Sequence, residues 1–389
     1  MRTKGDFLIF GSPCIGQEEI DEVVASMKSG WIGTGPKTAQ FENDFALYKE
    51  AAYAVAVNSG TAALHLAMLV AGIGPGDEVI TTALTFCATI NTIIHAGATP
   101  VLADVDPVSM NIDPIEVEAK ITSRTKAILP VHFAGRPCDM DRLCAIASRH
   151  KLLIIEDCAH AIETEYKGRK AGLFGDVGCF SFYVTKNIVT GEGGMILTGN
   201  ENFAARAKTL ALHGMSADAW SRFSDSEYKH YKVTGAGFKY NMMDIQAAIG
   251  MHQLRRVDQW WERRKEIWAK YNKAFAELPV ELPAAPEPET RHAYHLYTML
   301  IDKEKTGISR DDFLRAMHKQ NIGVGVHYLS IPEHPFYQER FGWHAADYPI
   351  AMRIGQQTVS IPLSPKLTDV DVFDVIEAVT DLVGTPTTE

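Results

Sequence analysis

Residues 152–157 read Leu-Leu-Ile-Ile-Glu-Asp, and this stretch decides the fold. Four consecutive apolar residues followed at once by two carboxylates are typical of a strand that is buried on both faces. Six more short apolar runs, with longer amphipathic stretches between them, lie at 54–57, 79–82, 100–105, 127–131, 179–183 and 195–197. The alternation predicts an α/β fold in which helices cover both faces of an open, mostly parallel sheet.

The C-terminal part of the chain has a different pattern. Apolar residues recur at helical spacing from Leu254 to Phe275, which predicts one long connecting helix over about 243–275. Four prolines between 279 and 288 then predict a linker. Beyond it we expect strands at 294–301 and 322–328 and helices at 311–319 and 369–382. The predicted domains are a large one at 1–250 and a smaller C-terminal α+β domain at 251–389.

Composition excludes several classes of protein. The 389 residues, 46% of them hydrophobic, are ample for a large core. A formal net charge of −10 does not suit a nucleic-acid-binding surface. No apolar run is long enough for a membrane helix, and no secretory signal opens the chain. Six cysteines without CxxC spacing favour reduced thiols. We expect a cytoplasmic protein with no metal, no nucleic-acid partner and no membrane contact.

Glycine motifs for nucleotide binding are not supported. The segment WIGTGPK, with Gly33, Gly35 and Pro36, is not preceded by a predicted strand and is not expected to open a helix, so it does not fit a dinucleotide fingerprint. The phosphate-binding loop pattern of nucleoside triphosphatases is absent from the sequence. Hydride transfer and nucleoside triphosphate chemistry are therefore disfavoured.

A candidate anion site lies at residues 58–64, NSGTAAL, where the strand at 54–57 ends and a helix begins. The amides at such a helix start, with the Thr61 hydroxyl beside them and Gly60 allowing close approach, can cradle a phosphate. The alternative is an ordinary helix start capped by Ser59.

Glu156 and Asp157 stand where the central strand ends, with His160 shortly after them. A carboxylate at the mouth of a buried strand needs a cationic partner or a metal. No second cluster of His or Asp at ligand spacing lies nearby, which disfavours the metal. Periodicity does not decide which of the two carboxylates is the functional one.

Lys186 leaves the apolar run at 179–183 just before the glycine-rich segment 191–194. A lysine in partly apolar surroundings loses its proton more readily and can attack an aldehyde. The alternative is a solvated charge on a loop. Taken together, a phosphate cradle, a carboxylate for a cationic ring nitrogen and a lysine for a carbonyl are the three contacts that pyridoxal 5'-phosphate needs, and all three fall at one edge of the predicted sheet.

The sequence resembles the DegT/DnrJ/EryC1/StrS family of sugar aminotransferases over nearly its whole length. The matching segments include WIGTGPKTAQFE, NSGTAALHLA, IIEDCAHAIETEYKGRKAG, SFYVTKNIVTGEGG, GFKYNMMDIQAAIGMHQL and VGVHYLSIPEHPFY. The resemblance is greatest to the branch that aminates C4 of nucleotide-linked 4-keto sugars. It implies pyridoxal-phosphate-dependent fold type I, L-glutamate as amino donor with 2-oxoglutarate as its product, and a homodimer with shared active sites.

The resemblance also implies roles for single residues. Lys186 is expected to bond to the cofactor aldehyde, Asp157 to face the pyridine nitrogen, and His160 to lie near the phenolic oxygen. Phe86 is similar to the residue that stacks on the ring. The phosphate ligands implied are Gly60, Thr61 and Ser181, together with Asn241 donated across the dimer interface.

Substrate contacts are expected from Tyr183, His213, Lys239 and His327, with Arg222, Lys229 and His230 as further cationic candidates. Many relatives read SFHPxK where this chain has SFYVTK, so Tyr183 replaces the family's histidine. Another branch has Asn and Arg where this chain has Lys239 and Asn241, which weakens a transfer of 3-aminotransferase specificity. A lysine at position 186 favours transamination over sugar dehydration, because the related dehydratases carry histidine there.

Other functions stay open at this point. The chain could aminate a 3-keto sugar, a cyclitol or an aminobenzoate precursor. A non-catalytic regulator that binds pyridoxal phosphate is a further alternative.

Overall fold

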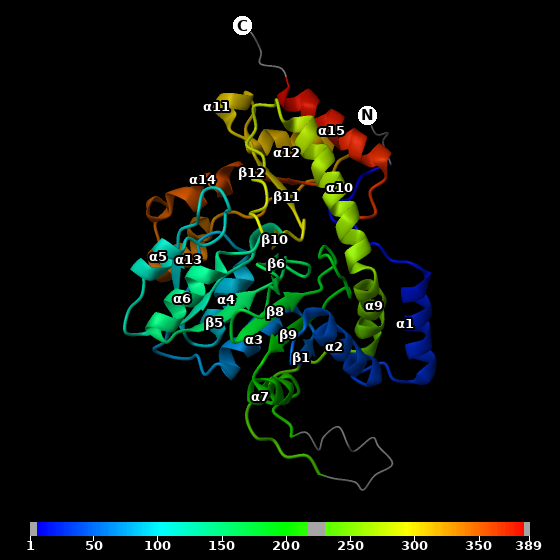
Figure 1. Ribbon diagram of the computed structural model, residues 1–389, viewed down its shortest axis with the longest axis vertical. Helices are drawn as coiled ribbons and strands as arrows, with labels where there is room; N and C mark the ends of the chain where they lie inside the picture. Colours follow the sequence, from blue (N-terminus) through cyan, green and yellow to red (C-terminus); the bar gives the residue numbers. More distant parts are fainter. Residues whose placement is uncertain (1–5, 217–229, 385–389) are drawn as a thin grey trace.

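The computed structural model describes residues 6–216 and 230–384. Its centre is a seven-stranded sheet of order β1-β9-β8-β5-β4-β2-β3 (Figure 1). The strands are β1 (Tyr53–Val57), β2 (Glu78–Thr82), β3 (Thr99–Ala103), β4 (Thr125–Leu129), β5 (Leu153–Asp157), β8 (Val177–Ser181) and β9 (Gly194–Thr198). Each of the seven predicted apolar runs forms one of them. Within this sheet β9 alone is antiparallel to its neighbours, so the prediction of a mostly parallel α/β sheet is confirmed.

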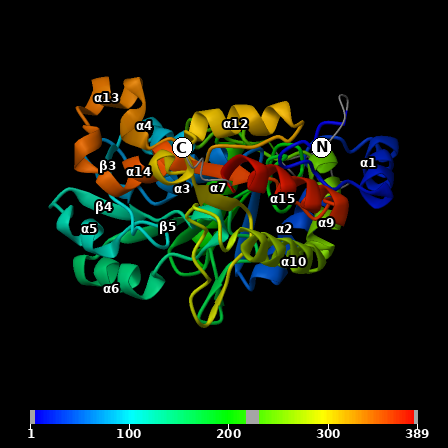
Figure 2. The same cartoon turned by 90° about the horizontal axis from the view of Figure 1, so that it is seen from above.

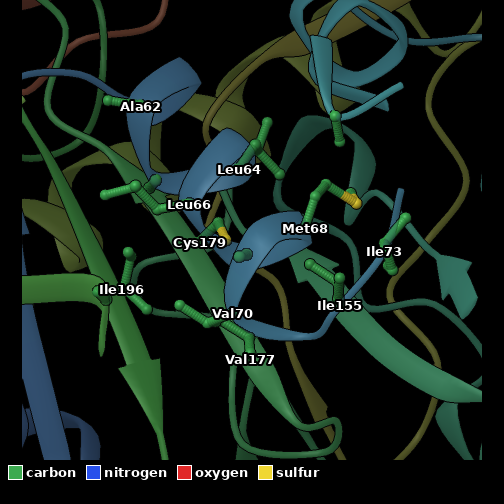
Figure 3. Packing of buried hydrophobic residues seen from close by; sticks show 14 of the residues in the cluster. Ala62, Leu64, Leu66, Met68, Val70, Ile73, Ile155, Val177, Cys179 and Ile196 are labelled. Atoms are coloured by element: carbon green, nitrogen blue, oxygen red, sulfur yellow. The ribbon is translucent and has the colours of Figure 1, made fainter. Parts of the chain in front are cut away.

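Helices cover both faces of the sheet, which is why its strands are apolar throughout. In β1, Val55 and Val57 face the cluster formed by α3 (Gly60–Val70) and α7 (Glu201–Ala211). Figure 3 shows this cluster, with α3 lying over β5, β8 and β9. The alternate residues Ala54 and Ala56 face α2 (Pro36–Lys49) and α9 (Asp244–Arg255) on the other side. The helices α4 (Cys87–His95), α5 (Pro114–Ala119) and α6 (Met140–His150) complete the two layers.

The predicted helix over 243–275 is two helices. α9 ends at Arg255 and α10 (Val257–Phe275) begins two residues later, and Arg256 between them has φ −106° and ψ 1°. Its guanidinium forms an ion pair with Glu19 of α1 (Gln17–Ser29) and stacks on the Trp260 ring. These contacts hold Arg256 outside the helical conformation, and apolar spacing does not reveal them.

The C-terminal elements build a second core above the sheet (Figure 1). A two-stranded sheet of β11 (Tyr297–Leu300) and β12 (Thr358–Ile361) packs with α10, α12 (Arg310–Lys319) and α15 (Asp369–Val383), which lie together in Figure 2. The predicted strand at 322–328 is wrong. That segment forms only the isolated bridges Leu8↔Ile322 and Gly325↔Ser360: β11 takes one edge of β12, and on the other edge only Gly325 pairs with it.

The remaining elements are short. A small sheet joins β6 (Glu165–Tyr166), β7 (Arg169–Lys170) and β10 (Thr290–Arg291), and the segment between β11 and α15 also contains α11 (Lys303–Thr306), α13 (Pro335–Phe341) and α14 (Pro349–Gln357). Within residues 6–216 and 230–384, no helix has the length and apolarity needed to cross a membrane.

The segment WIGTGPK does open a helix, contrary to expectation, because Pro36 is the first residue of α2. The buried carboxylate of Asp244 accepts hydrogen bonds from the amides of Gly35, Lys37 and Thr38 at 2.7, 3.1 and 2.9 Å. The cap thus comes from a residue more than two hundred positions away in the sequence. The segment still does not follow a strand, as a dinucleotide fingerprint requires.

Candidate active site

A cavity of about 360 Å³ opens at the carboxyl ends of β5 and β8. It brings together residues from the large sheet, the starts of α3 and α4, and the loop between α12 and α13. Among the predicted site residues, the lining contains Gly60, Thr61, Phe86, Asp157, His160, Ser181, Tyr183, Lys186 and His327.

One end of the cavity is the start of α3. Ser59 is the N-cap, and its Oγ accepts a hydrogen bond from the Ala62 amide at 3.0 Å. The amides of Gly60 and Thr61 precede the first bonds of the helix and lie at the cavity. A Cβ on Gly60 would stand 2.8 Å from the Cβ of Ser181, so a side chain there would force the helix start away from β8. The cap and the anion cradle are therefore features of one helix start.

The two carboxylates at the end of β5 point to opposite faces, as neighbours in a strand do. Asp157 lies at the cavity and accepts hydrogen bonds from the Thr89 hydroxyl at 2.9 Å and the Ala159 amide at 3.1 Å. Burial raises its pKa above the ordinary value, against the lowering effect of these donors and of Lys186. Asp157 is the carboxylate of the cavity.

Glu156 has a structural environment. Its oxygens accept hydrogen bonds from the amides of Gly172, Phe174 and Gly175, and the fourth contact is His132 Nε2 at 3.0 Å. Burial acts to raise its pKa, but these donors lower it below the ordinary value. With Cys158, Glu156 and His132 form the one group of metal-ligand types within 4.8 Å of one another in the described residues. All four of these donors bind the Glu156 carboxylate, and three of them are amides of the loop before β8. Glu156 therefore anchors that loop.

Lys186 follows β8 in a tight turn, with its amide donating to the Tyr183 carbonyl at 2.8 Å. Its side chain lines the cavity and is partly exposed to that space. Removal from bulk water lowers its pKa to about 8, and the attraction of Asp157 opposes part of this effect. At pH 7 about a tenth of the amine is therefore unprotonated and nucleophilic, far more than for a lysine with the ordinary pKa.

His160 has a defined tautomer. Its Nδ1 accepts a hydrogen bond from the Ala134 amide at 3.2 Å, so the proton stays on Nε2, which donates to Tyr328 Oη at 2.9 Å. Burial, together with the nearby Lys186, holds the pKa of His160 well below its usual range. The site thus contains a neutral imidazole whose outer nitrogen donates.

The entrance carries aromatic and imidazole groups. Phe86 and Tyr183 are exposed at the cavity, and the Phe86 ring centroid lies 5.9 Å from that of Tyr328. His327 is held by Ser360 Oγ, 2.8 Å from its Nδ1, and burial lowers its pKa to about 3. These groups offer apolar faces and neutral donors rather than fixed positive charge.

Three predicted residues do not line this cavity. Lys239 and His213 are exposed, and Asn241 bonds through Nδ2 to Thr34 Oγ1 at 2.6 Å. His230 is also exposed, whereas Arg222 and Lys229 lie outside the described residues.

Sequence reasoning missed Tyr328 and Thr89. Tyr328 stands in the matching segment VGVHYLS, but its contact with His160 spans 168 positions, so no local pattern predicts it. Thr89 sits one turn into α4, where a threonine has no distinctive signal.

Comparisons with known proteins agree with one another. A model of the DegT/DnrJ/EryC1/StrS aminotransferase family matches residues 13–380. The chain is 50% identical to the spore coat polysaccharide biosynthesis protein SpsC of Bacillus subtilis, over 98% of this chain and 99% of that protein.

Two solved structures extend the comparison. The putative sugar aminotransferase Spr1654 of Streptococcus pneumoniae superimposes with a TM-score of 0.90 at 33% identity, covering 97% of this chain and 99% of that one. DesV of S. venezuelae, solved in complex with a ketimine intermediate, gives a TM-score of 0.85 at 34% identity, covering 95% of each chain.

Proposed function

The chain belongs to the DegT/DnrJ/EryC1/StrS aminotransferase family, and from this premise we propose that it moves the amino group of L-glutamate to C4 of a nucleotide-linked 4-keto sugar. It is a pyridoxal-phosphate-dependent sugar aminotransferase. The name of SpsC ties that relative to a spore coat polysaccharide, which supports a polysaccharide as the destination of the amino sugar made here.

The observation that carries the proposal is the cavity itself, which brings together one group for each of three parts of the cofactor. The open amides of α3 beside Ser181 suit a phosphate, and the close approach at Gly60 leaves no room for a side chain. The Asp157 carboxylate suits a protonated ring nitrogen, and Lys186 suits an aldehyde. These residues therefore fit pyridoxal 5'-phosphate.

When bound, pyridoxal phosphate supplies a ring that withdraws the electron pair left behind by a departing proton. The chain's own residues handle the protons. Lys186 Nζ, with its lowered pKa, removes the proton from Cα of glutamate as a general base. In the second half-reaction the same nitrogen delivers a proton to the sugar carbon that receives the amine.

Asp157 and His160 set the electronic state of the site. A carboxylate at hydrogen-bond distance raises the pKa of a ring nitrogen by about one to three units, which keeps that nitrogen protonated. His160 is neutral and donates its Nε2 proton to Tyr328 Oη, so it borders the cavity without adding charge. Phe86, exposed at the cavity, provides a flat apolar surface for a ring.

We propose a homodimer with shared active sites. Asn241, Lys239 and His213 lie off the cavity of their own chain, so their predicted roles require a second subunit. Lys239 and His213 are exposed and thus available to a partner's site. A nucleotide sugar carries a diphosphate, and Lys239 would supply positive charge at the entrance of the partner's cavity, where that chain's own imidazoles are neutral.

The function is tested by supplying L-glutamate and a panel of keto compounds to the reconstituted enzyme. We expect 2-oxoglutarate to form with nucleotide-linked 4-keto sugars, and the product's NMR spectrum to place the new amine at C4. Turnover only with 3-keto sugars, with keto inositols or with an aminobenzoate precursor would replace the proposal by the corresponding alternative. An enzyme whose visible spectrum does not change with glutamate would be a non-catalytic binder.

A further inference from the structure

A buried polar network adjoins Lys186 through the next residue of the chain, and its four members are not among the residues that line the cavity. Its members are Arg264 of α10, Glu163, Asn187 and His295, and each is at most 5% exposed. Arg264 Nη1 pairs with Glu163 Oε1 at 3.1 Å. The proton-transfer steps proposed above use none of these residues, although Asn187 follows Lys186 in the chain.

The orientation of the Asn187 amide follows from its partners. Nδ2 lies 2.8 Å from Glu163 Oε2 and 3.0 Å from the Ala293 carbonyl, and both of these can only accept. Oδ1 therefore faces His295 Nδ1, 2.9 Å away, and this imidazole nitrogen must carry the proton. Asn187 thus fixes the tautomer of His295.

His295 in turn supports the imidazole of the active site. Its ring lies 4.4 Å from that of His160, centroid to centroid, at an angle of 35°. Burial holds the pKa of His295 well below its usual range, and Lys186, His327, Arg264 and His292 all act in the same direction. His295 therefore packs against His160 as a neutral ring of fixed tautomer, while the Ala134 amide separately keeps the His160 proton on Nε2.

The main chain is anchored at the same point. Arg264 Nη2 donates to the backbone carbonyl of Asn187 at 3.2 Å. Asn187 is therefore held both by its side chain and by its backbone carbonyl. The carbonyl contacts Arg264 of α10 directly, and the side chain contacts it through Glu163. Removing the Asn187 side chain would leave the buried Glu163 carboxylate without one of its hydrogen-bond donors.

We propose that Asn187 is a positioning residue for transamination: its carbonyl ties the main chain beside Lys186 to Arg264, and its side chain fixes the orientation of His295, the ring that packs against His160. The proposal deepens the proposed function, because it rests on Lys186 and His160 acting in that reaction.

The first test compares Asn187→Leu with Gln253→Met. Gln253 is a buried amide on α9, bonded to the Cys14 carbonyl and to Glu19, so its variant loses buried hydrogen bonds close to the network but none of those within it. For Asn187→Leu we expect kcat to fall on the order of tenfold to a hundredfold with little change in KM, as for a misplaced reacting group. We also expect the pH midpoint of the visible absorbance of the holoenzyme to move by about one unit. Gln253→Met should lower Tm and move neither quantity.

The second test needs no substrate. In the cofactor-free protein labelled with ¹⁵N-histidine, the wild type should show His295 neutral and protonated at Nδ1, whereas Asn187→Asp should shift its nitrogen signals to those of a protonated ring. The double variant Asn187→Asp/Glu163→Gln restores an amide–carboxylate pair and the total charge, so Tm should recover while the His295 signals stay shifted.

The proposal is overturned if Asn187→Leu keeps the wild-type pH midpoint, if Gln253→Met moves it equally, or if His295 carries its proton on Nε2. A wild-type enzyme that fails to aminate keto sugars refutes the proposed function instead, since the histidine signals are read without any substrate.

Discussion

Lys186 is a cation that the fold has removed from water, and this has a measurable cost. Its pKa in the folded protein is about 8 against an ordinary value of 10.5, so below pH 8 the folded chain must hold a proton that its surroundings disfavour. In the cofactor-free protein we expect Lys186→Met to increase the free energy of unfolding at pH 7 by about 1–3 kcal/mol.

The stability that Lys186→Met adds should decrease as the pH rises. Between about pH 8 and 10.5 the unfolded chain binds the lysine proton and the folded chain does not, so wild-type stability rises relative to the variant. Urea denaturation at pH 7 and pH 10 measures the difference, and other titrating groups cancel in the comparison. If the stability added by Lys186→Met increased with pH instead, burial would not lower the pKa of Lys186.

Asp157 has a predicted effect on chemistry without a large effect on folding. In Asp157→Asn the Ala159 amide keeps its acceptor, and the Thr89 hydroxyl can accept from the new amide. The lost carboxylate should lower the rate of the glutamate half-reaction by roughly 10- to 1000-fold, the equivalent of one to three pKa units on the ring nitrogen. Stopped-flow absorbance gives the rate, and Tm serves as the control. A variant with the wild-type rate would remove Asp157 from the mechanism.

Among the helices, α2 depends on a cap from far along the chain. Asp244 binds three backbone amides and the Thr38 hydroxyl at the start of α2, and it is completely buried. Asp244→Ala should therefore cost about 2–4 kcal/mol of stability, more than an ordinary N-cap.

Asp113→Ala is the matched control for Asp244→Ala. Asp113 caps α5 through a single amide, that of Ile115, and is only partly buried. Its loss should cost about 0.5–1 kcal/mol. Equal urea midpoints for the two variants would contradict the role given to Asp244.

Elements were predictable where the pattern is local. The seven strands could be located because burial on both faces leaves continuous apolar runs, and α12 and α15 because their apolar residues follow the helical period. The break at Arg256 and the irregular course of 322–328 depend on partners elsewhere in the fold, Glu19 in one case and β12 in the other. The start of α2 was missed for the same reason.

The candidate site divides in the same way. Lys186, Asp157 and Gly60 each stand at the end of a predicted strand or the start of a predicted helix, so the parallel topology alone brings them together. The sequence pattern alone did not tell which of Asp157 and Glu156 is functional, and only the family resemblance selected Asp157. In the structure the two side chains lie on opposite faces of β5, and Asp157 is the one at the cavity. Tyr328 and the network around Asn187 join segments whose proximity no local pattern encodes.

At the scale of the whole molecule, the proposed dimer makes a complementation experiment possible. Lys186→Ala should inactivate its own cavity, whereas Asn241→Ala should weaken the site of the partner. If equal amounts of the inactive and the weakened variant exchange subunits, half of the dimers are mixed, and one of the two sites in each is intact. We expect recovery of about a quarter of wild-type activity.

Mixing each variant with itself is the control for complementation, and light scattering reports the oligomeric state. No recovery despite proven subunit exchange would place Asn241 in the site of its own chain. A monomer with full activity would end the proposal of shared sites.

The wall of the cavity formed by His327 and Tyr328 also bears on biosynthesis of the enzyme. These residues leave the ribosome long after Lys186, so a nascent chain has the reactive amine before it has the pocket that shelters it. The complete pocket therefore exists only once translation has passed Tyr328, and a polypeptide terminated before that residue would lack this wall beside the lysine.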